Sequence, residues 1–198
     1  FGPGARQSFL TSFAFSAALS TIFSALLSGA TIYFYPVKER GIHGLAEWLN
    51  ENRITVFYPP VSLFNSFVDA LKPDDFFPHL RLLLLGGQRV QVDCVQAFRK
   101  HITSECFIKH SLASSEAGTS SSLIITSQTV LTEAELPVGY PTVDKEVKIL
   151  DEQGAELGSG QLGEIAIRGR YVAGGYWGAA QSNLGKFMPD PSGSGEML

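Results

Sequence analysis

The sequence contains few charged residues and no strongly basic segment. Of its 198 residues, 15 are Lys or Arg and 19 are Asp or Glu, which gives a formal net charge of −4. No basic run is longer than Arg99–Lys100. Proteins that bind nucleic acid or an anionic membrane surface through charge need a basic patch, which is missing here. We therefore expect neither nucleic acid nor a membrane among the partners.

Cysteine is also scarce. Cys94 and Cys106 are the two cysteines, and together with the four histidines they show no metal-ligand spacing. The sequence also lacks a glycine-rich phosphate loop followed by lysine, which excludes a P-loop nucleotide site. Reduced, buried thiols in a cytoplasmic protein fit this pattern best.

One apolar run, residues 13–30, invites interpretation as a membrane span. It carries serines at a helical spacing of four, at Ser16, Ser20, Ser24 and Ser28. No basic segment precedes it, as a signal peptide would require. We therefore expect a buried core helix. Its large apolar residues are Leu19, Ile22, Phe23, Leu26 and Leu27.

Strand and helix patterns alternate at short spacing through the first two thirds of the chain. This alternation predicts an α/β fold with a mostly parallel sheet flanked by helices. The apolar run 80–85 is typical of a strand covered on both faces. Strands are predicted at 30–35, 54–58, 80–85 and 105–109, and helices at 45–52, 61–71 and 92–101.

The pattern changes after residue 136. Charged and apolar residues alternate over 144–150, a turn follows at 151–154, and glycines bound a further strand at 163–169. We expect a small antiparallel β subdomain at 137–198, after an α/β subdomain at 1–136. Residues 179–198 are rich in Gly, Ser, Pro and Asn and are predicted to form a surface loop.

Two segments of small residues follow predicted strands. Gly86, Gly87 and Gln88 come directly after the strand at 80–85, where ligands bind in open parallel sheets. The segment 111–118, Ser-Leu-Ala-Ser-Ser-Glu-Ala-Gly, follows the next strand. Each has a structural alternative: a strand-to-helix turn for the first, and a helix N-cap with an acid in the first turn for the second.

Glu116 is the one acid in the second segment. A carboxylate beside a polyphosphate is repelled unless a divalent cation lies between them, so Glu116 is a candidate Mg²⁺ ligand. Ser115 is a candidate donor to a phosphate oxygen. A third segment, 163–177, reads as a strand followed by a glycine-rich bend with two aromatic residues, and taken alone it indicates a structural hairpin.

Taken in order, these segments resemble the adenylate-forming enzymes, which include nonribosomal peptide synthetase adenylation domains, acyl-CoA ligases and luciferases. Residues 12–16, Ser-Phe-Ala-Phe-Ser, resemble the segment that opens the acyl pocket. Residues 85–88, Leu-Gly-Gly-Gln, resemble the Gly-Gly-Glu adenine loop, and residues 112–116 the Tyr-Gly-x-Thr-Glu motif. Residues 138–141, Val-Gly-Tyr-Pro, and 163–177 are similar to two later motifs of the family.

The resemblance implies an ATP- and Mg²⁺-dependent enzyme that activates a small carboxylic acid as an acyl adenylate. The acyl group then passes to the phosphopantetheine thiol of a carrier protein or to CoA. Glu116 and Ser115 are the implied catalytic residues, with Glu116 as the metal ligand. The implied nucleotide contacts are Gly86, Gly87, Gln88, Leu112, Ala113 and Ser114. The implied acyl contacts are Ser16, Ala17, Ser20, Phe57, Leu84, Gly86, Ser111, Thr119 and Ser120.

Two residues depart from the family pattern. Leu112 stands where an aromatic side chain usually stacks on adenine. Ser16 stands where synthetase domains for α-amino acids carry an Asp that pairs with the substrate ammonium. A buried ammonium without that partner is unfavourable. We therefore expect an acid without a free α-ammonium, such as a fatty, aryl, hydroxy or keto acid.

The family's phosphate loop, ribose motif and lysine-bearing domain do not match any residues here. We therefore expect this chain to be part of a longer protein and to be inactive in isolation, because positioning supplies much of the rate in such chemistry. Two alternatives remain open: an acyl-CoA ligase, and a non-catalytic α/β module derived from the family.

Overall fold

The computed structural model describes residues 2–188. The chain forms two compact units. The first unit holds the residues up to 111 together with 123–139, and the second holds 112–122 and the residues from 140 onward. The predicted division into subdomains at 1–136 and 137–198 stays a prediction.

The larger sheet of the chain has seven strands, of which β1 to β4 lie wholly in the first unit and β7 in the second. Its order is β2-β1-β3-β4-β5-β6-β7, with parallel pairing from β2 through β5, and β7 antiparallel to β6. The predicted mostly parallel α/β sheet is confirmed. The strands are β1 (Arg6–Phe9), β2 (Thr31–Phe34), β3 (Val56–Phe57), β4 (Leu82–Gly86), β5 (Phe107–Ser114), β6 (Gly118–Ile125) and β7 (Tyr140–Pro141).

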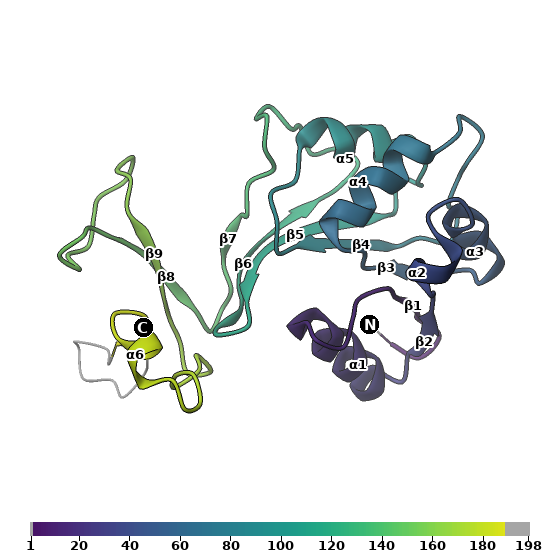
Figure 1. The fold of residues 1–198 in the computed structure, drawn as a ribbon. Coiled ribbons are helices and arrows are strands. Elements are labelled where there is room, and N and C mark those ends of the chain that lie inside the picture. Colours follow the sequence, from purple (N-terminus) through teal and green to yellow (C-terminus); the bar gives the residue numbers. More distant parts are fainter. Residues whose placement is uncertain (1, 189–198) are drawn as a thin grey trace. The chain divides into compact units, whose positions relative to one another are not determined.

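Helices cover both faces of this sheet. The chain moves outward from β1 to β2 through α1 and then returns across the sheet to β3, β4 and β5. Right-handed crossovers in opposite directions place their helices on opposite faces, so α1 lies on one face and α4 and α5 on the other (Figure 1). The helices are α1 (Ser16–Ser28), α2 (Val37–Arg40), α3 (Leu45–Glu51), α4 (Val61–Ala70) and α5 (Val92–Arg99).

The core of the first unit lies between the sheet and α4 and α5. Four fully buried phenylalanines form its centre, with Phe64 edge-on to Phe98 at 5.2 Å and Phe77 stacked on Phe98 at 5.9 Å. Phe67 lies 5.7 Å from Phe77. Such ring pairs add about 1 kcal/mol each to the free energy gained by burial.

The strand at 80–85 differs from its prediction. Leu83 and Leu85 are buried in the core, while Leu82 and Leu84 are only half-buried. Successive side chains of a strand point to opposite faces, so only the face that α4 and α5 cover is fully packed in the described residues.

Helix α1 contradicts the expectation of a buried core helix. Its buried residues are small: Ala18, Thr21 and Ala25. They share one face and let the helix axis approach the sheet closely, and the Thr21 hydroxyl donates to the Ala17 carbonyl at 3.0 Å. The larger apolar side chains point away from the sheet and are exposed. These are Leu19, Phe23, Leu26 and Leu27, exposed by 57%, 55%, 69% and 86%.

The second unit contains an antiparallel hairpin, as the alternating pattern predicted. Strands β8 (Glu146–Leu150) and β9 (Glu164–Arg168) pair with Ile149 opposite Ile165. Lys148 forms ion pairs with Glu146 at 3.4 Å and with Glu156 at 2.9 Å. These pairs are accessible to solvent, so each adds little to stability.

The segment predicted as a surface loop is partly helical. A short helix, α6, spans Ala180–Asn183, and its side-chain amide at Asn183 bonds the backbone of Tyr176. The end of this predicted loop, residues 189–198, lies outside the described residues. Within residues 2–188, none of the helices combines the length and apolarity needed to cross a lipid bilayer.

Burial makes both cysteine thiols weaker acids than in an unfolded chain. It raises the pKa of Cys94 and of Cys106 to about 11 from an ordinary value of 9. Since the thiolate is the nucleophile, we expect alkylation by iodoacetamide at pH 8 to be about 100-fold slower in the native than in the urea-unfolded protein. Mass spectrometry of each cysteine peptide over time measures this ratio.

The same pKa shifts predict how stability depends on pH. A folded-state pKa raised above the unfolded value gives stabilisation that is complete below about pH 9 and is lost as the pH rises towards 11. The free energy of unfolding should therefore fall across this window, and less so in Cys94→Ser. Equal alkylation rates in the native and unfolded protein would contradict both expectations.

Candidate functional site

The segment 111–118 forms the tip of a β-hairpin. It was expected to be a loop after a strand, with a helix N-cap as the alternative, and the structure corrects both expectations. β5 continues to Ser114 and β6 begins at Gly118, so Ser111 lies within a strand and the turn is confined to residues 115–117. No helix follows, and the helix N-cap alternative is therefore wrong. Gly118 has a left-handed φ of 66°, which favours glycine where β6 begins.

Hydrogen bonds fix the conformation of this hairpin tip. The Ser114 hydroxyl accepts the Ala117 amide at 3.1 Å, which closes the turn. The Glu116 carbonyl accepts the Ala173 amide at 2.7 Å, which joins the tip to the glycine-rich bend that follows β9. Both groups of the peptide bond between Glu116 and Ala117 are thus hydrogen-bonded.

The Glu116 carboxylate has a specific partner in the same unit. The Tyr176 hydroxyl donates to Glu116 Oε1 at 2.5 Å. This hydrogen bond lowers the pKa of the Glu116 carboxyl, and the nearby charge of Lys186 lowers it further. The same bond raises the pKa of Tyr176. At neutral pH Glu116 is therefore an anion whose orientation the phenol restricts.

Glu116 lines a pocket of about 540 Å³ within the second unit. Its wall includes Leu112, Ser114, Tyr176 and Lys186. A carboxylate, a hydroxyl and an ammonium group thus surround one cavity that has an apolar wall at Leu112. Protein sites for Mg²⁺ usually supply one or two carboxylates and leave the other positions to water and phosphate, so this donor set fits the ion.

The three residues predicted to border adenine lie at the carboxyl end of β4. Gly86 pairs with Ser111 of β5. A Cβ on Gly86 would lie 2.9 Å from the Ser111 carbonyl oxygen, so the close approach of these strands requires glycine. Gly87 has a left-handed φ of 79°, and both Gly87 and Gln88 are exposed. The turn therefore leaves bare backbone open to a ligand.

Several predicted acyl contacts share one face of the first unit. Leu83 and Leu85 point into the core beside α4 and α5, so strand alternation turns Leu84 and Gly86 to the face that carries α1. Ser111 pairs with Gly86 and shares its face. On α1 itself, Ser16 and Ser20 are exposed and Ala17 is half-buried.

Phe57 does not belong to this group. It is fully buried in the core and packs edge-on against Phe67 at 5.6 Å. Because Phe57 pairs with Leu83, it points to the opposite face from Leu84. The prediction of Phe57 as an acyl contact is therefore corrected. Alternation places the next residue, Tyr58, on the α1 face, and burial raises the pKa of its hydroxyl.

The last two predicted acyl contacts lie on β6 in the second unit. Thr119 is exposed, and its carbonyl accepts a hydrogen bond from the Thr142 hydroxyl at 3.2 Å. Ser120 is fully buried, and its hydroxyl has no partner among the described residues. Ala113 and Ser115 are exposed at the hairpin. The described residues contain no group of three or more His, Cys, Asp or Glu side chains that could hold a metal by themselves.

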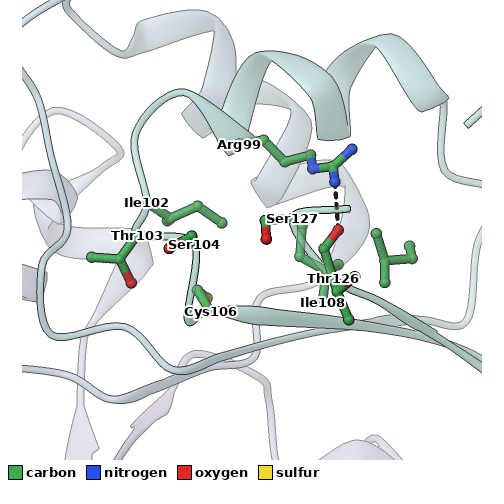
Figure 2. A pocket seen from close by; sticks show the side chains of 9 residues that line it. Arg99, Ile102, Thr103, Ser104, Cys106, Ile108, Thr126 and Ser127 are labelled. Atoms are coloured by element: carbon green, nitrogen blue, oxygen red, sulfur yellow. Dashed lines mark hydrogen bonds between the residues drawn. The ribbon is translucent and has the colours of Figure 1, made fainter. Parts of the chain in front are cut away.

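The sequence did not predict a role for three residues: Tyr176 and Lys186, which line the pocket of Glu116, and Asn183, which contacts Tyr176. Tyr176 lies in a motif that was noted without a role for its hydroxyl, whereas Asn183 and Lys186 fall in the predicted loop. Another pocket, of about 280 Å³, lies within the first unit, and none of the predicted site residues lines it (Figure 2). Arg99 lies on its wall and donates hydrogen bonds to the Thr126 and Thr129 carbonyls.

Known proteins resemble this chain in sequence over most of its length. A family model described as AMP-binding enzyme matches residues 2–177. Bacitracin synthase 1 of Bacillus licheniformis is 29% identical over 191 residues, which cover 96% of this chain and 4% of the synthase. The chain thus spans a small fraction of that relative's length.

Solved structures of similar fold cover the whole chain. CmiS6 superposes with a TM-score of 0.88 at 23% identity, over 100% of this chain and 49% of CmiS6. An artificially fused adenylation–PCP di-domain, NpsA-ThdA from Klebsiella oxytoca, gives a TM-score of 0.81 at 22% identity, over 100% of this chain and 36% of that chain. The predicted fold class is confirmed by these likenesses.

Proposed function

Because the chain belongs to the AMP-binding enzyme family, we propose that it contributes the adenine- and metal-contacting part of an adenylation domain in a nonribosomal peptide synthetase. In this proposal a carboxylic acid reacts with ATP to give an acyl adenylate and pyrophosphate. The observation that carries the proposal is the anionic Glu116, held by Tyr176 in a pocket that also contains Ser114 and Lys186.

The residues of the pocket have separate roles in this chemistry. Glu116 would hold Mg²⁺, which when bound neutralises charge on the triphosphate. Lys186 offers an ammonium group on the same cavity wall, and the exposed Ser115 hydroxyl can donate to a phosphate oxygen. Leu112 gives adenine an apolar wall without aromatic stacking. For Gly86–Gln88 at the carboxyl end of β4, we keep the nucleotide contact that the family resemblance implies.

The reaction needs no general base from the chain. An oxygen of the substrate carboxylate forms the new bond to the α-phosphorus of ATP, and the bond from that phosphorus to pyrophosphate breaks. A thiol then loses its proton to solvent, its sulfur forms a bond to the acyl carbon, and AMP leaves with the electron pair of the acyl–oxygen bond that breaks. We propose the phosphopantetheine thiol of a carrier protein as this acceptor, which the likeness to a peptide synthase supports.

The α1 face suggests the class of acid. Leu84 and Tyr58 are half-buried and uncharged on this face of the sheet, and Ser16 and Ser20 of α1 are exposed and uncharged. An α-ammonium buried against such residues would lack a counter-ion. We therefore propose an aryl, hydroxy, keto or fatty acid as the substrate.

ATP–pyrophosphate exchange in the full-length protein tests the proposal. Exchange should depend on the added acid and on Mg²⁺, and acids without an α-ammonium should support a higher rate than any proteinogenic amino acid. A clear preference for an amino acid would overturn the substrate class. Absence of exchange with every acid, together with no ATP binding, would indicate a non-catalytic module. Transfer to CoA but not to a carrier protein would indicate an acyl-CoA ligase.

A further inference from the structure

The hydrogen bond from Tyr176 reaches Glu116 across 60 positions of the sequence. Its O–O distance of 2.5 Å is that of a strong bond to an anion. Tyr176 is 40% exposed, so its ring is not held by a closed core. Something other than core packing must therefore keep the phenol at the carboxylate.

Asn183 provides that restraint. Its side-chain oxygen accepts the Tyr176 amide at 2.7 Å, and its side-chain nitrogen donates to the Tyr176 carbonyl at 3.2 Å. One amide group thus satisfies both backbone groups of Tyr176. The Phe187 ring packs edge-on against the Tyr176 ring at 5.2 Å and limits its rotation.

Gly175 leaves room for this arrangement. Its φ of 135° is unfavourable for other residues, and a Cβ there would lie 2.8 Å from the side-chain nitrogen of Asn183. Ala173, two residues earlier, donates its amide to the Glu116 carbonyl at 2.7 Å. The bend over residues 173–176 therefore contacts both the backbone and the side chain of Glu116, and Asn183 holds the end of the bend at Tyr176.

We propose that Tyr176, held by Asn183, is a positioning residue that fixes the orientation of the Glu116 carboxylate for a divalent cation. The proposal rests on the function proposed above. A glutamate side chain has several rotatable bonds, and a fixed donor on Oε1 restricts them before the cation arrives. Asn183 acts through Tyr176 and has no contact with the cation in this arrangement.

The test uses the purified protein with Mn²⁺ and ATP as probes. Electron paramagnetic resonance gives the Mn²⁺ affinity in the presence of ATP, and nuclear magnetic resonance couplings report the side-chain conformation of Glu116 without any ligand. We expect Tyr176→Phe and Asn183→Ala to weaken Mn²⁺ binding about tenfold and to average the Glu116 couplings. Tyr171→Phe, which removes an exposed hydroxyl from the same segment, is the matched control and should change neither.

A double variant separates positioning from general damage. If Tyr176 acts through Glu116, Tyr176→Phe should have no further effect on Mn²⁺ affinity in a Glu116→Gln background. Additive losses would overturn the proposal, as would unchanged Glu116 couplings in Tyr176→Phe. If the wild type binds no Mn²⁺ with ATP while Tyr176→Phe still averages the couplings, the proposed function fails and the positioning of Glu116 stands.

Discussion

Replacing Glu116 by glutamine is expected to lower the rate of ATP–pyrophosphate exchange in the full-length protein by about 100-fold. A bound metal contributes several kcal/mol of charge stabilisation in phosphoryl chemistry, and losing about 2.7 kcal/mol of it corresponds to that factor. Glutamine keeps the size of the side chain and can still accept the hydrogen bond from Tyr176, so the variant removes only the negative charge. Steady-state exchange at several Mg²⁺ concentrations measures the effect.

The Mg²⁺ dependence distinguishes a ligand from a structural residue. Glu116→Gln should shift half-maximal exchange to higher Mg²⁺, whereas a residue needed only for folding would lower the rate at every concentration alike. Glu133→Gln removes an exposed carboxylate elsewhere in the chain and is the control. An unchanged Mg²⁺ dependence in Glu116→Gln would exclude Glu116 as the metal ligand.

Patterns with a local cause could be predicted from the sequence. The alternation of strands and helices predicted the parallel sheet, because short runs rich in β-branched and aromatic residues and bounded by Gly or Pro are typical of strands. The turn at 151–154 and the strands on either side of it also formed as expected, with Ile149 opposite Ile165. Glu116 was identified by its motif, and the structure places it on the wall of a pocket.

Patterns that depend on the tertiary neighbour were harder to predict. Outside its serine stripe, helix α1 has both small and large apolar residues, so its composition cannot indicate which side packs, and the sheet accepts the small side at Ala18 and Ala25. Phe57 was predicted as an acyl contact, but its neighbour Tyr58 is the residue on the α1 face. A shift of one residue along a strand turns the side chain to the opposite face, so a small error in alignment selects the wrong residue.

The role of Asn183 had no signal in the sequence. An asparagine in a segment rich in Gly and Ser is typical of an ordinary loop. Its importance comes from two hydrogen bonds to a backbone seven residues earlier, a contact that depends on the path of the intervening chain. The same limit applies to Tyr176, because its partner Glu116 lies 60 positions earlier in the sequence, before the β8–β9 hairpin.

The glycine before β9 has a role that its motif does not explain, and it leads to a prediction about stability. A Cβ on Gly163 would overlap the Leu150 carbonyl oxygen and would lie 2.8 Å from Leu157 Cδ1 and 2.9 Å from Ile149 Cγ2. The carbonyl belongs to the paired strand and cannot move without breaking the hairpin register. Gly163→Ala should therefore destabilise the hairpin by about 3 kcal/mol.

Amide hydrogen exchange tests this expectation within the hairpin itself. Protection of the amides in β8 and β9 should fall by about 100-fold in Gly163→Ala, while amides of β4 in the first unit keep their protection, because local opening is governed by local contacts. Gly158→Ala is the matched control, since its Cβ would meet only the Gln161 side-chain oxygen at 3.5 Å. If both variants keep wild-type protection, steric exclusion at Gly163 is not what fixes the register. If β4 also loses protection, the two units unfold together, and the hairpin is then no independent part of the fold.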